Sequence, residues 1–422
     1  MIRLIEALRF RCLRYVRQPM GPFHVLVGPN ASGKTTFLDV VAFLGQLVSD
    51  GPDAAIRQRT QNLDDLLWNR QGDTFELAIE VAIPEDRRKG VLAPKWDTIR
   101  YEVRVGRHPQ TSENGVLEER VLLKAWTEPL RTEQEGFPSP CEPPETIMSK
   151  ASESPRHTRH VLSQTERGDG EYECRFRPES SDVWMPTVKA SVRRSILELF
   201  YGDDIQFPVS TWLKNLLTQG VQELCLNSLL IRKPSRPGQP RGFQPDGSNI
   251  PWLIHELEKP EHKKRLNDWI SHLRTVLPDI EGIRTVEREE DRHRYLKIKY
   301  QGGLEVPSWM VSDGTLRMLA LTLPAYLPEI RGVYLIEEPE NGVHPSAIEA
   351  IYQSLSSVYE AQILLATHSP VILSMADAGQ VLCFKKTEEG ATDIIRGRDH
   401  PALRDWQGDP NLSVLFAAGV LG

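Results

Sequence analysis

Residues Gly28–Thr36 read GPNASGKTT and directly follow the apolar run FHVLV at Phe23–Val27. The loop fits the pattern G-x-x-x-x-G-K-[ST], in which glycines let successive backbone N–H groups turn toward phosphate oxygens. Apolar residues then recur at helical spacing over Thr35–Val48. The alternative is a plain glycine-rich turn before a helix. A buried strand, a glycine loop and a helix in this order instead predict a nucleoside triphosphate site in an α/β fold.

The residue types within this loop predict individual roles. Lys34 supplies a point charge for the β and γ phosphates, and the Thr35 hydroxyl can ligate magnesium. The following helix presents its N-terminus to the anion, and Thr36 is expected to contact the α phosphate. ATP and Mg²⁺ are therefore the predicted ligands. The candidate nucleotide-binding residues of the loop are Gly28, Pro29, Asn30, Ala31, Ser32, Gly33, Lys34, Thr35 and Thr36.

A second motif, VYLIEEPENGVHP, spans Val333–Pro345. Its apolar residues end in two carboxylates, which a buried strand would carry to the sheet edge where phosphates bind. Glu337 is expected near the magnesium ion, through a water, and Glu338 is expected to polarise the attacking water as general base. The alternative is a strand that ends in a solvated acidic turn, and the glycine loop elsewhere in the chain argues against it.

Two further segments complete the pattern. His368, in ATHSP at Ala366–Pro370, follows an apolar strand and could donate a hydrogen bond to the γ phosphate, although a lone histidine is more often structural. In SDGTLRMLAL at Ser312–Leu321, Ser312 and Gly314 precede an apolar helix whose N-terminus favours an anion. Because the glycine loop already covers its own nucleotide, these two residues are expected to cap the γ phosphate held by a second subunit.

The composition sets the broad class of the protein. The chain has 422 residues, with 51 Lys and Arg against 58 Asp and Glu, and its net charge of −7 gives no support for coating nucleic acid. A local basic groove stays open. The five cysteines are scattered without a CxxC pair, so a reducing cytoplasm fits. Neither a signal peptide nor a run of about twenty apolar residues is evident, so no membrane contact is expected.

The length suggests one large domain with an insertion, or two domains. Alternating segments at Thr74–Ile83, Ile99–Val105 and Val116–Trp126 predict antiparallel strands beside the nucleotide. From Ser312 onward helices alternate with buried strands, which predicts a parallel sheet. The expected fold is therefore α/β with a mixed sheet, interrupted by a loop-rich part (128–181) and helices (187–230). The expected divisions are 1–127, the insertion 128–245, and 246–422.

Taken in order, the glycine loop, the SDGT segment, the EEPE strand and the THSP turn resemble the ABC-type ATPases of the RecF, SMC and OLD-like clade, which are AAA family ATPases. The resemblance covers about 1–125 and 245–422 and implies an ABC-type P-loop ATPase head that dimerises head to head around two ATPs. Lys34, Glu338 and His368 are then the catalytic candidates. The resemblance places Ser312 and Gly314 at the signature, Glu337 at the Walker B acid, Glu338 at the catalytic glutamate, Asn341–His344 at the D-loop and His368 at the switch histidine.

The sequence departs from the family pattern at three points. The signature reads SDGT rather than SGG, so Asp313 makes its second position acidic. The acid expected near magnesium, Glu337, is not an aspartate. Gln58, Gln61 and Gln71 are all open as the Q-loop glutamine, with Gln71 favoured.

Two functions follow from the resemblance. The first is an ATPase, a homodimer or higher oligomer, that controls a separate nuclease-like effector in prokaryotic anti-phage defence. OLD-like proteins often carry a nuclease module after the ATPase, and no room is expected for one here. The second is a RecF- or SMC-like ATPase of DNA repair or chromosome maintenance. The arginines that could line a DNA groove, or be ordinary edge-strand residues, are Arg3, Arg9, Arg11, Arg14, Arg17, Arg57 and Arg59.

Overall fold

The computed structural model describes residues 1–89, 91, 95–129, 136–149, 158–166, 172–199, 204–240, 242–404, 412–417 and 419. An inner strand of the mixed sheet is β3 (Phe23–Val27), whose five residues are all buried. β3 pairs in parallel with one strand on each side, and this burial explains its continuous apolar run. The parallel sheet expected from the sequence is confirmed, with one antiparallel strand, β17, at its edge. In sheet order the strands are β10 (Val221–Leu224), β14 (Gly332–Glu337), β15 (Ala361–Ala366), β3, β16 (Val381–Lys386) and β17 (Thr392–Arg396).

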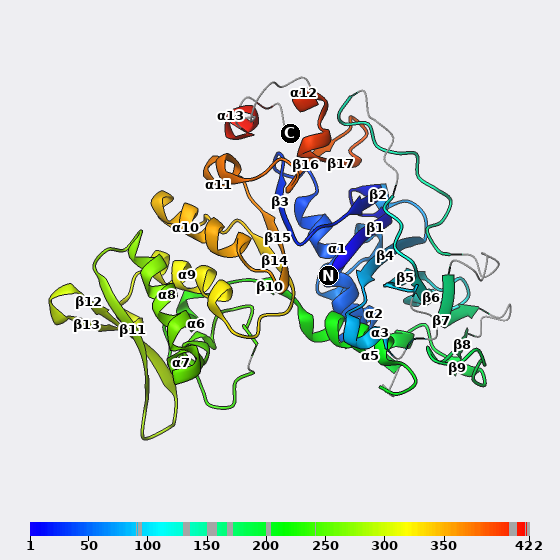
Figure 1. Ribbon diagram of the computed structural model, residues 1–422. Helices are drawn as coiled ribbons and strands as arrows, with labels where there is room; N and C mark the ends of the chain where they lie inside the picture. Colours follow the sequence, from blue (N-terminus) through cyan, green and yellow to red (C-terminus); the bar gives the residue numbers. More distant parts are fainter. Residues whose placement is uncertain are drawn as a thin grey trace.

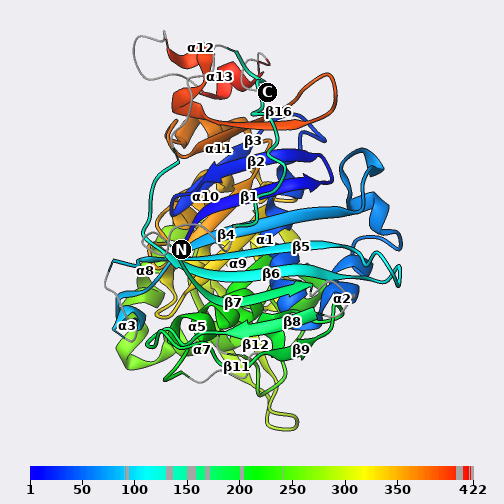
Figure 2. The ribbon, with the colours of Figure 1, turned by 90° about the vertical axis from the view of Figure 1, so that its right-hand side faces the viewer.

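The second sheet is antiparallel and begins at the N-terminus. Figure 2 shows it nearly face on, with its strands following one another from β2 to β9. The antiparallel strands expected from the sequence are confirmed, and each pairs with its neighbour, with a shift of register in the β1–β4 and β5–β6 pairs. In sheet order they are β2 (Leu13–Pro19), β1 (Ile2–Phe10), β4 (Thr74–Ala82), β5 (Thr98–Arg107), β6 (Asn114–Lys124), β7 (Thr158–Glu166), β8 (Tyr172–Phe176) and β9 (Val188–Ala190).

Helix α1 (Lys34–Asp50) lies between the two sheets, as Figure 1 shows. Its side chains join one hydrophobic core with the antiparallel sheet. The rings of Phe43 and Phe75 meet edge to face at 5.5 Å, and Phe10 lies 5.0 Å from Phe75. Such ring contacts add to the free energy gained from burying the apolar area. They fix the helix that begins at the glycine loop to the sheet behind it.

The opposite face of the mixed sheet carries the other large helices and a second core. A separate small sheet packs there with α7 (Ile250–Glu258) and α8 (Lys263–Arg274). Its strands are β11 (Ile280–Glu287), β12 (Arg294–Tyr300) and β13 (Glu305–Pro307). No helix among the described residues is long and apolar enough to cross a membrane. The remaining helices are α2 (Pro52–Arg57), α3 (Glu85–Arg88), α4 (Ile196–Leu199), α5 (Pro208–Asn215), α6 (Ser228–Ile231), α9 (Asp313–Thr322), α10 (Pro345–Ser356), α11 (Pro370–Met375), α12 (Pro401–Arg404) and α13 (Leu412–Ala417).

The segment 128–245, expected to be mainly helical or loop-rich, also contains strands among its described residues, which the sequence pattern did not predict. β7, β8 and β9 extend the antiparallel sheet, and β10 joins the mixed sheet beside β14. Polar residues at inward positions concealed the alternation of β7. Gln164, for example, is fully buried and donates to the Val116 carbonyl at 3.0 Å. The middle of the chain therefore contributes strands to both sheets.

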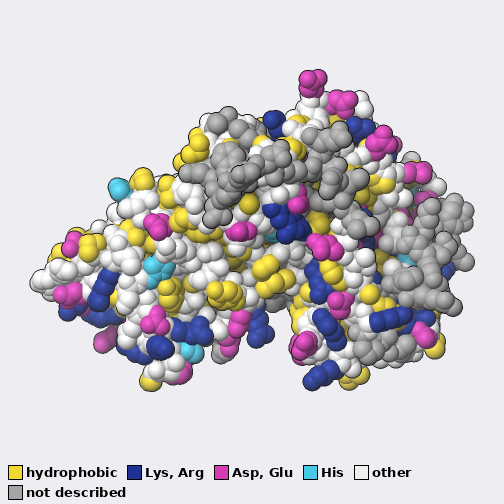
Figure 3. Space-filling view, turned by 45° about the horizontal axis from the view of Figure 1, so that its top comes forward, with side chains coloured by type: hydrophobic (Ala, Val, Ile, Leu, Met, Phe, Trp, Pro, Cys, Tyr) yellow, Lys and Arg dark blue, Asp and Glu magenta, His cyan; other side chains and the backbone are white. Residues whose placement is uncertain are grey.

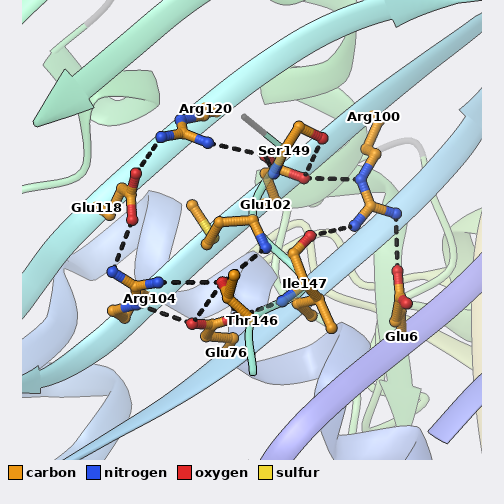
Figure 4. Close-up of polar contacts among 11 residues, drawn as sticks. Glu6, Glu76, Arg100, Glu102, Arg104, Glu118, Arg120, Thr146, Ile147 and Ser149 are labelled. Atoms are coloured by element: carbon orange, nitrogen blue, oxygen red, sulfur yellow. Dashed lines mark hydrogen bonds and ion pairs between the residues drawn. The ribbon is translucent and has the colours of Figure 1, made fainter. Parts of the chain in front are cut away.

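Charged side chains, rather than apolar ones, line part of the outer face of the antiparallel sheet (Figure 4). Arg100 lies 2.9 Å from a Glu6 oxygen, 3.2 Å from Glu80 and 2.7 Å from Glu102. The chain segment 146–149 covers these charges. Its backbone N–H groups donate to buried carboxylates, for example from Ser149 to Glu102 at 2.7 Å. Buried charges are tolerated here because they are paired and hydrogen-bonded.

Candidate nucleotide-binding site

The glycine loop requires backbone conformations that L side chains rarely adopt. Gly28 has φ 151° and Gly33 has φ 107°, and Ala31 also has a positive φ of 61°. A Cβ on Gly28 would lie 2.3 Å from the Phe384 carbonyl oxygen. Thr392, on the edge strand β17, donates to the Ser32 carbonyl at 2.9 Å. The last strands of the chain therefore hold the loop from behind.

This loop forms one wall of a cavity of about 360 Å³ at the carboxyl ends of β3, β14 and β15. Parallel sheets place ligand sites at this edge. Of the expected site residues, Gly28 and Pro29 do not line the cavity, and Ser312 and Gly314 do not either. The lining residues are Arg11, Cys12, Asn30, Ala31, Ser32, Gly33, Lys34, Thr35, Thr36, Glu337, Glu338, Ala366, His368 and Lys386.

Lys34 begins α1 and is almost fully buried. Its Nζ donates to the carbonyls of Gly28 at 2.8 Å and Pro29 at 3.0 Å. Burial lowers the pKa of Lys34, while the Glu338 and Glu337 carboxylates oppose that shift. A cation held by the loop itself, at the N-terminus of a helix, suits a polyphosphate. The buried Ser32 Oγ has no hydrogen-bond partner among the described residues, which also fits a ligand that accepts from it.

The two acids of the second motif lie at the end of β14 but differ in environment. The Thr35 hydroxyl donates to Glu337 Oε2 at 2.7 Å, so two hard oxygen donors meet at one point. This pair fits Mg²⁺, which prefers oxygen ligands. Glu338 follows the strand with a positive φ of 45°, and its side chain accepts from the Asn341 amide. Non-glycine residues in this conformation often belong to functional sites.

His368 lies after β15, and β15 separates β14 from β3 in the sheet. Burial and the nearby Lys34 charge lower the pKa of His368, whereas Glu338 and Glu340 raise it. The backbone N–H of His368 donates to Glu340 Oε1 at 2.9 Å. The imidazole thus reaches the same cavity as the acids from an adjacent strand.

The SDGT segment lies outside the cavity and caps helix α9. The Ser312 side chain accepts from the Thr315 N–H at 3.2 Å, and Arg232 forms an ion pair of 2.6 Å with Asp313. A Cβ on Gly314 would lie 2.9 Å from the Gly342 carbonyl oxygen. The start of α9 therefore packs against the turn that follows the two acids.

Sequence reasoning missed three side chains that line the cavity. Arg11 and Cys12 lie in the turn between β1 and β2, and Lys386 ends β16. In the sequence, the arginines around Arg11 indicate only a candidate DNA surface. No local motif marks Lys386, because pairing of β16 with β3 brings it to the loop. Gln58, Gln61 and Gln71 do not line the cavity.

The fold is that of an ABC-type P-loop ATPase head, and the cavity is lined by residues expected at a nucleotide site. More specifically, the chain belongs to the family described as "AAA domain, putative AbiEii toxin, Type IV TA system", whose model matches residues 23–139 and 250–374, more than half of the chain. A comparison with curated proteins found no match.

Solved structures of Smc heads are similar over nearly the whole chain. The Smc head bound to the C-winged helix domain of ScpA has a TM-score of 0.51 at 13% identity, covering 93% of this chain and 97% of that chain. An Smc head with an extended coiled coil, bound to the C-terminal domain of ScpA from Pyrococcus furiosus, has a TM-score of 0.47 at 13% identity, covering 93% and 95%. The SMC head domain from Thermotoga maritima has 0.45 at 12%, covering 94% and 98%. The first likeness supports the fold alone.

Proposed function

We propose that the protein binds ATP with Mg²⁺ and hydrolyses it at a site that a second copy completes. One observation carries this proposal: Lys34, Thr35, Glu337, Glu338 and His368 surround one cavity, whereas the SDGT segment lies outside it. Because the SDGT segment lies outside the cavity of its own copy, it can contact a nucleotide only if another copy holds that nucleotide. A twofold dimer supplies that arrangement, because each copy then offers its SDGT segment to the nucleotide of the other.

The roles of the residues follow from their positions. Lys34 and the loop N–H groups neutralise the β and γ phosphates. Thr35 and Glu337 would hold the magnesium ion, which would supply charge stabilisation at the transferring phosphoryl group. Glu338 accepts a proton from the attacking water. His368 donates a hydrogen bond to a γ-phosphate oxygen. Burial, and then the nearby Lys34 charge, lower the pKa of the His368 imidazole.

The test is the Glu338→Gln variant. Because Gln cannot accept the proton, ATP turnover should fall at least about 100-fold while ATP still binds. The unhydrolysed ATP should stabilise the dimer, which size-exclusion chromatography with Mg-ATP would detect. Glu349→Gln, at an exposed position of α10, is the matched control and should leave turnover unchanged. Unchanged turnover in Glu338→Gln would assign the base to another residue, and no turnover by the native protein would overturn the proposal.

We further propose that this ATPase works in the cytoplasm and controls a separate nuclease-like effector in anti-phage defence. The description of its family, which names a putative toxin of a Type IV TA system, supports a defence setting. Purification of the native complex with the products of neighbouring genes tests it. Repeated recovery of the ATPase alone, with no protection of cells against phage, would count against this role.

A DNA-handling role is the second candidate, and the Smc-like fold favours it. Six of the seven candidate arginines form ion pairs with carboxylates, so their charge is partly neutralised. Figure 3 shows basic and acidic side chains interspersed on the described part of one face. Duplex DNA binding that weakens steeply with salt, together with ATP turnover stimulated by DNA, would favour this role over the first.

A further inference from the structure

The turn after β14 and the turn after β15 are joined by one carboxylate, Glu340. Its Oε1 accepts from the Thr367 hydroxyl at 2.7 Å and from the His368 N–H at 2.9 Å. The same Thr367 oxygen accepts from the Ser369 N–H at 2.9 Å. Glu340 therefore fixes the backbone on which His368 is carried.

The sheet does not need this link to hold the two turns together. β14 and β15 already pair up to Glu337 and Ala366, and the Glu338 N–H donates to Ala366 at 2.8 Å. A carboxylate is also a costly choice for the position, because Glu340 Oε2 is buried with no partner among the described residues. A costly side chain that the sheet does not require points to a role at the site.

The turn that carries Glu340 also contacts α9 on its other side. Arg317 donates to the Asn341 carbonyl at 2.7 Å, and Gly314 packs against Gly342. One turn thus touches both the helix capped by Ser312 and the segment that carries His368.

We infer that Glu340 is a positioning residue that acts through His368 and couples its placement to the N-terminus of α9. The inference rests on the proposed function, in which Ser312 meets the nucleotide of the second copy. When the N-terminus of α9 contacts the nucleotide of the second copy, any shift of α9 is passed to the turn after β14. Glu340, on that turn, then shifts His368 of the same copy. Each nucleotide site would in this way respond to the occupancy of the other.

The test is a double-mutant cycle of Glu340→Ala and His368→Ala, read as steady-state ATP turnover. If Glu340 acts through His368, each single variant should lower kcat by roughly 10- to 100-fold with KM for ATP little changed. The double variant should be no worse than the more severe single variant. Glu340→Gln should recover most of the rate, because its amide oxygen still accepts both hydrogen bonds. Glu349→Gln is the surface control.

A second pair of variants covers the case in which Glu340→Ala does not fold. Thr367→Val removes one of the two donors and should lower kcat, and Thr367→Ser, which keeps the hydroxyl, should lower it less. The inference would be overturned if the fold losses in kcat of Glu340→Ala and His368→Ala multiply in the double variant. Equal losses in kcat for the two Thr367 variants would also overturn it. Both outcomes would leave the ATPase proposal intact. An inactive native protein would reject the ATPase proposal instead.

Discussion

Gly28 shows how far a single side chain can disturb the site. An added Cβ would overlap the Phe384 carbonyl, and the backbone φ of 151° is strained for an L residue. Gly28→Ala should therefore displace the loop and weaken ATP binding at least about tenfold, with about 1–3 kcal/mol of strain. Titration with a fluorescent ATP analogue would measure the loss of affinity. Gly282→Ala, where a Cβ meets open space, is the control, and equal affinities in the two variants would contradict the close fit.

His24, on β3, predicts a pH effect on stability. Burial lowers its pKa to about 4, and its ring accepts from Gly21 and faces the Gln380 carbonyl. The unfolded chain protonates this histidine near its ordinary pKa of about 6.5, so between these values it binds more protons than the native state. Stability due to His24 is complete above about pH 6.5 and falls by up to about 1.4 kcal/mol per pH unit as the pH drops toward 4.

Urea unfolding of the native protein and of His24→Gln at about pH 7 and about pH 5 measures this effect. The variant loses packing at both pH values, so the informative quantity is the difference between the two proteins. That difference should shrink at the lower pH. A difference that does not change with pH would exclude His24 as a source of acid sensitivity.

Among single residues, those that lie within a local sequence motif could be predicted from the sequence. Lys34, Thr35, Glu337, Glu338 and His368 lie around one cavity as the motifs require, although their chemical roles remain predictions. Arg11 and Lys386 also line the cavity, but no motif marks them. Because only the pairing of strands brings them to the loop, they could not be predicted from the sequence.

Among the elements, the charged face of the antiparallel sheet is the most sensitive to a single change. Removing Arg100 would leave the carboxylates of Glu6, Glu80 and Glu102 buried together. Figure 4 shows the contacts of Arg100 with Glu6 and Glu102. Arg100→Ala should lower the free energy of unfolding by about 3–5 kcal/mol. Arg17→Ala removes an exposed guanidinium 3.7 Å from the buried Glu6, which Arg100 still pairs, and should cost about 0–1 kcal/mol. Equal urea midpoints for the two variants would show that the network adds no stability.

The same face explains why some strands were missed. Periodicity found β4, β5 and β6, where apolar residues alternate clearly. In β7, polar residues such as Arg159 and Gln164 occupy buried positions and bond to carbonyls of other segments, at Pro178 and Val116. A pattern of apolar residues cannot reveal a strand that is buried through such pairs.

For the whole molecule, the composite site predicts complementation between two defective variants. Lys34→Ala removes the cation that the cavity offers to the phosphates. Ser312→Asp keeps the helix cap but places a negative charge against the phosphate held by the second copy. Each variant alone should be inactive. Their mixture should regain about a quarter of the native ATP turnover, because half of the random dimers carry one intact site.

Ser312→Asn, which keeps the cap without the charge, is the control for this experiment and should retain more turnover than Ser312→Asp. No recovery on mixing, under conditions where the two variants exchange subunits, would mean that each copy hydrolyses ATP by itself. The sequence of one chain could suggest such a dimer only indirectly, from the second anion-binding segment at Ser312 and Gly314 and from the resemblance, since the second surface belongs to another copy.

The position of β3 has a consequence for how the chain is made. Its sheet partners β15 and β16 begin at Ala361 and Val381, more than three hundred residues after Phe23. On the ribosome, the apolar β3 emerges early and stays without these partners until most of the chain has been translated, whereas β1, β2 and β4 can pair soon after synthesis. Contacts so distant in sequence form slowly and expose apolar surface meanwhile. We expect nascent chains of this protein to bind chaperones through β3, and to acquire nucleotide affinity only in the last steps of translation.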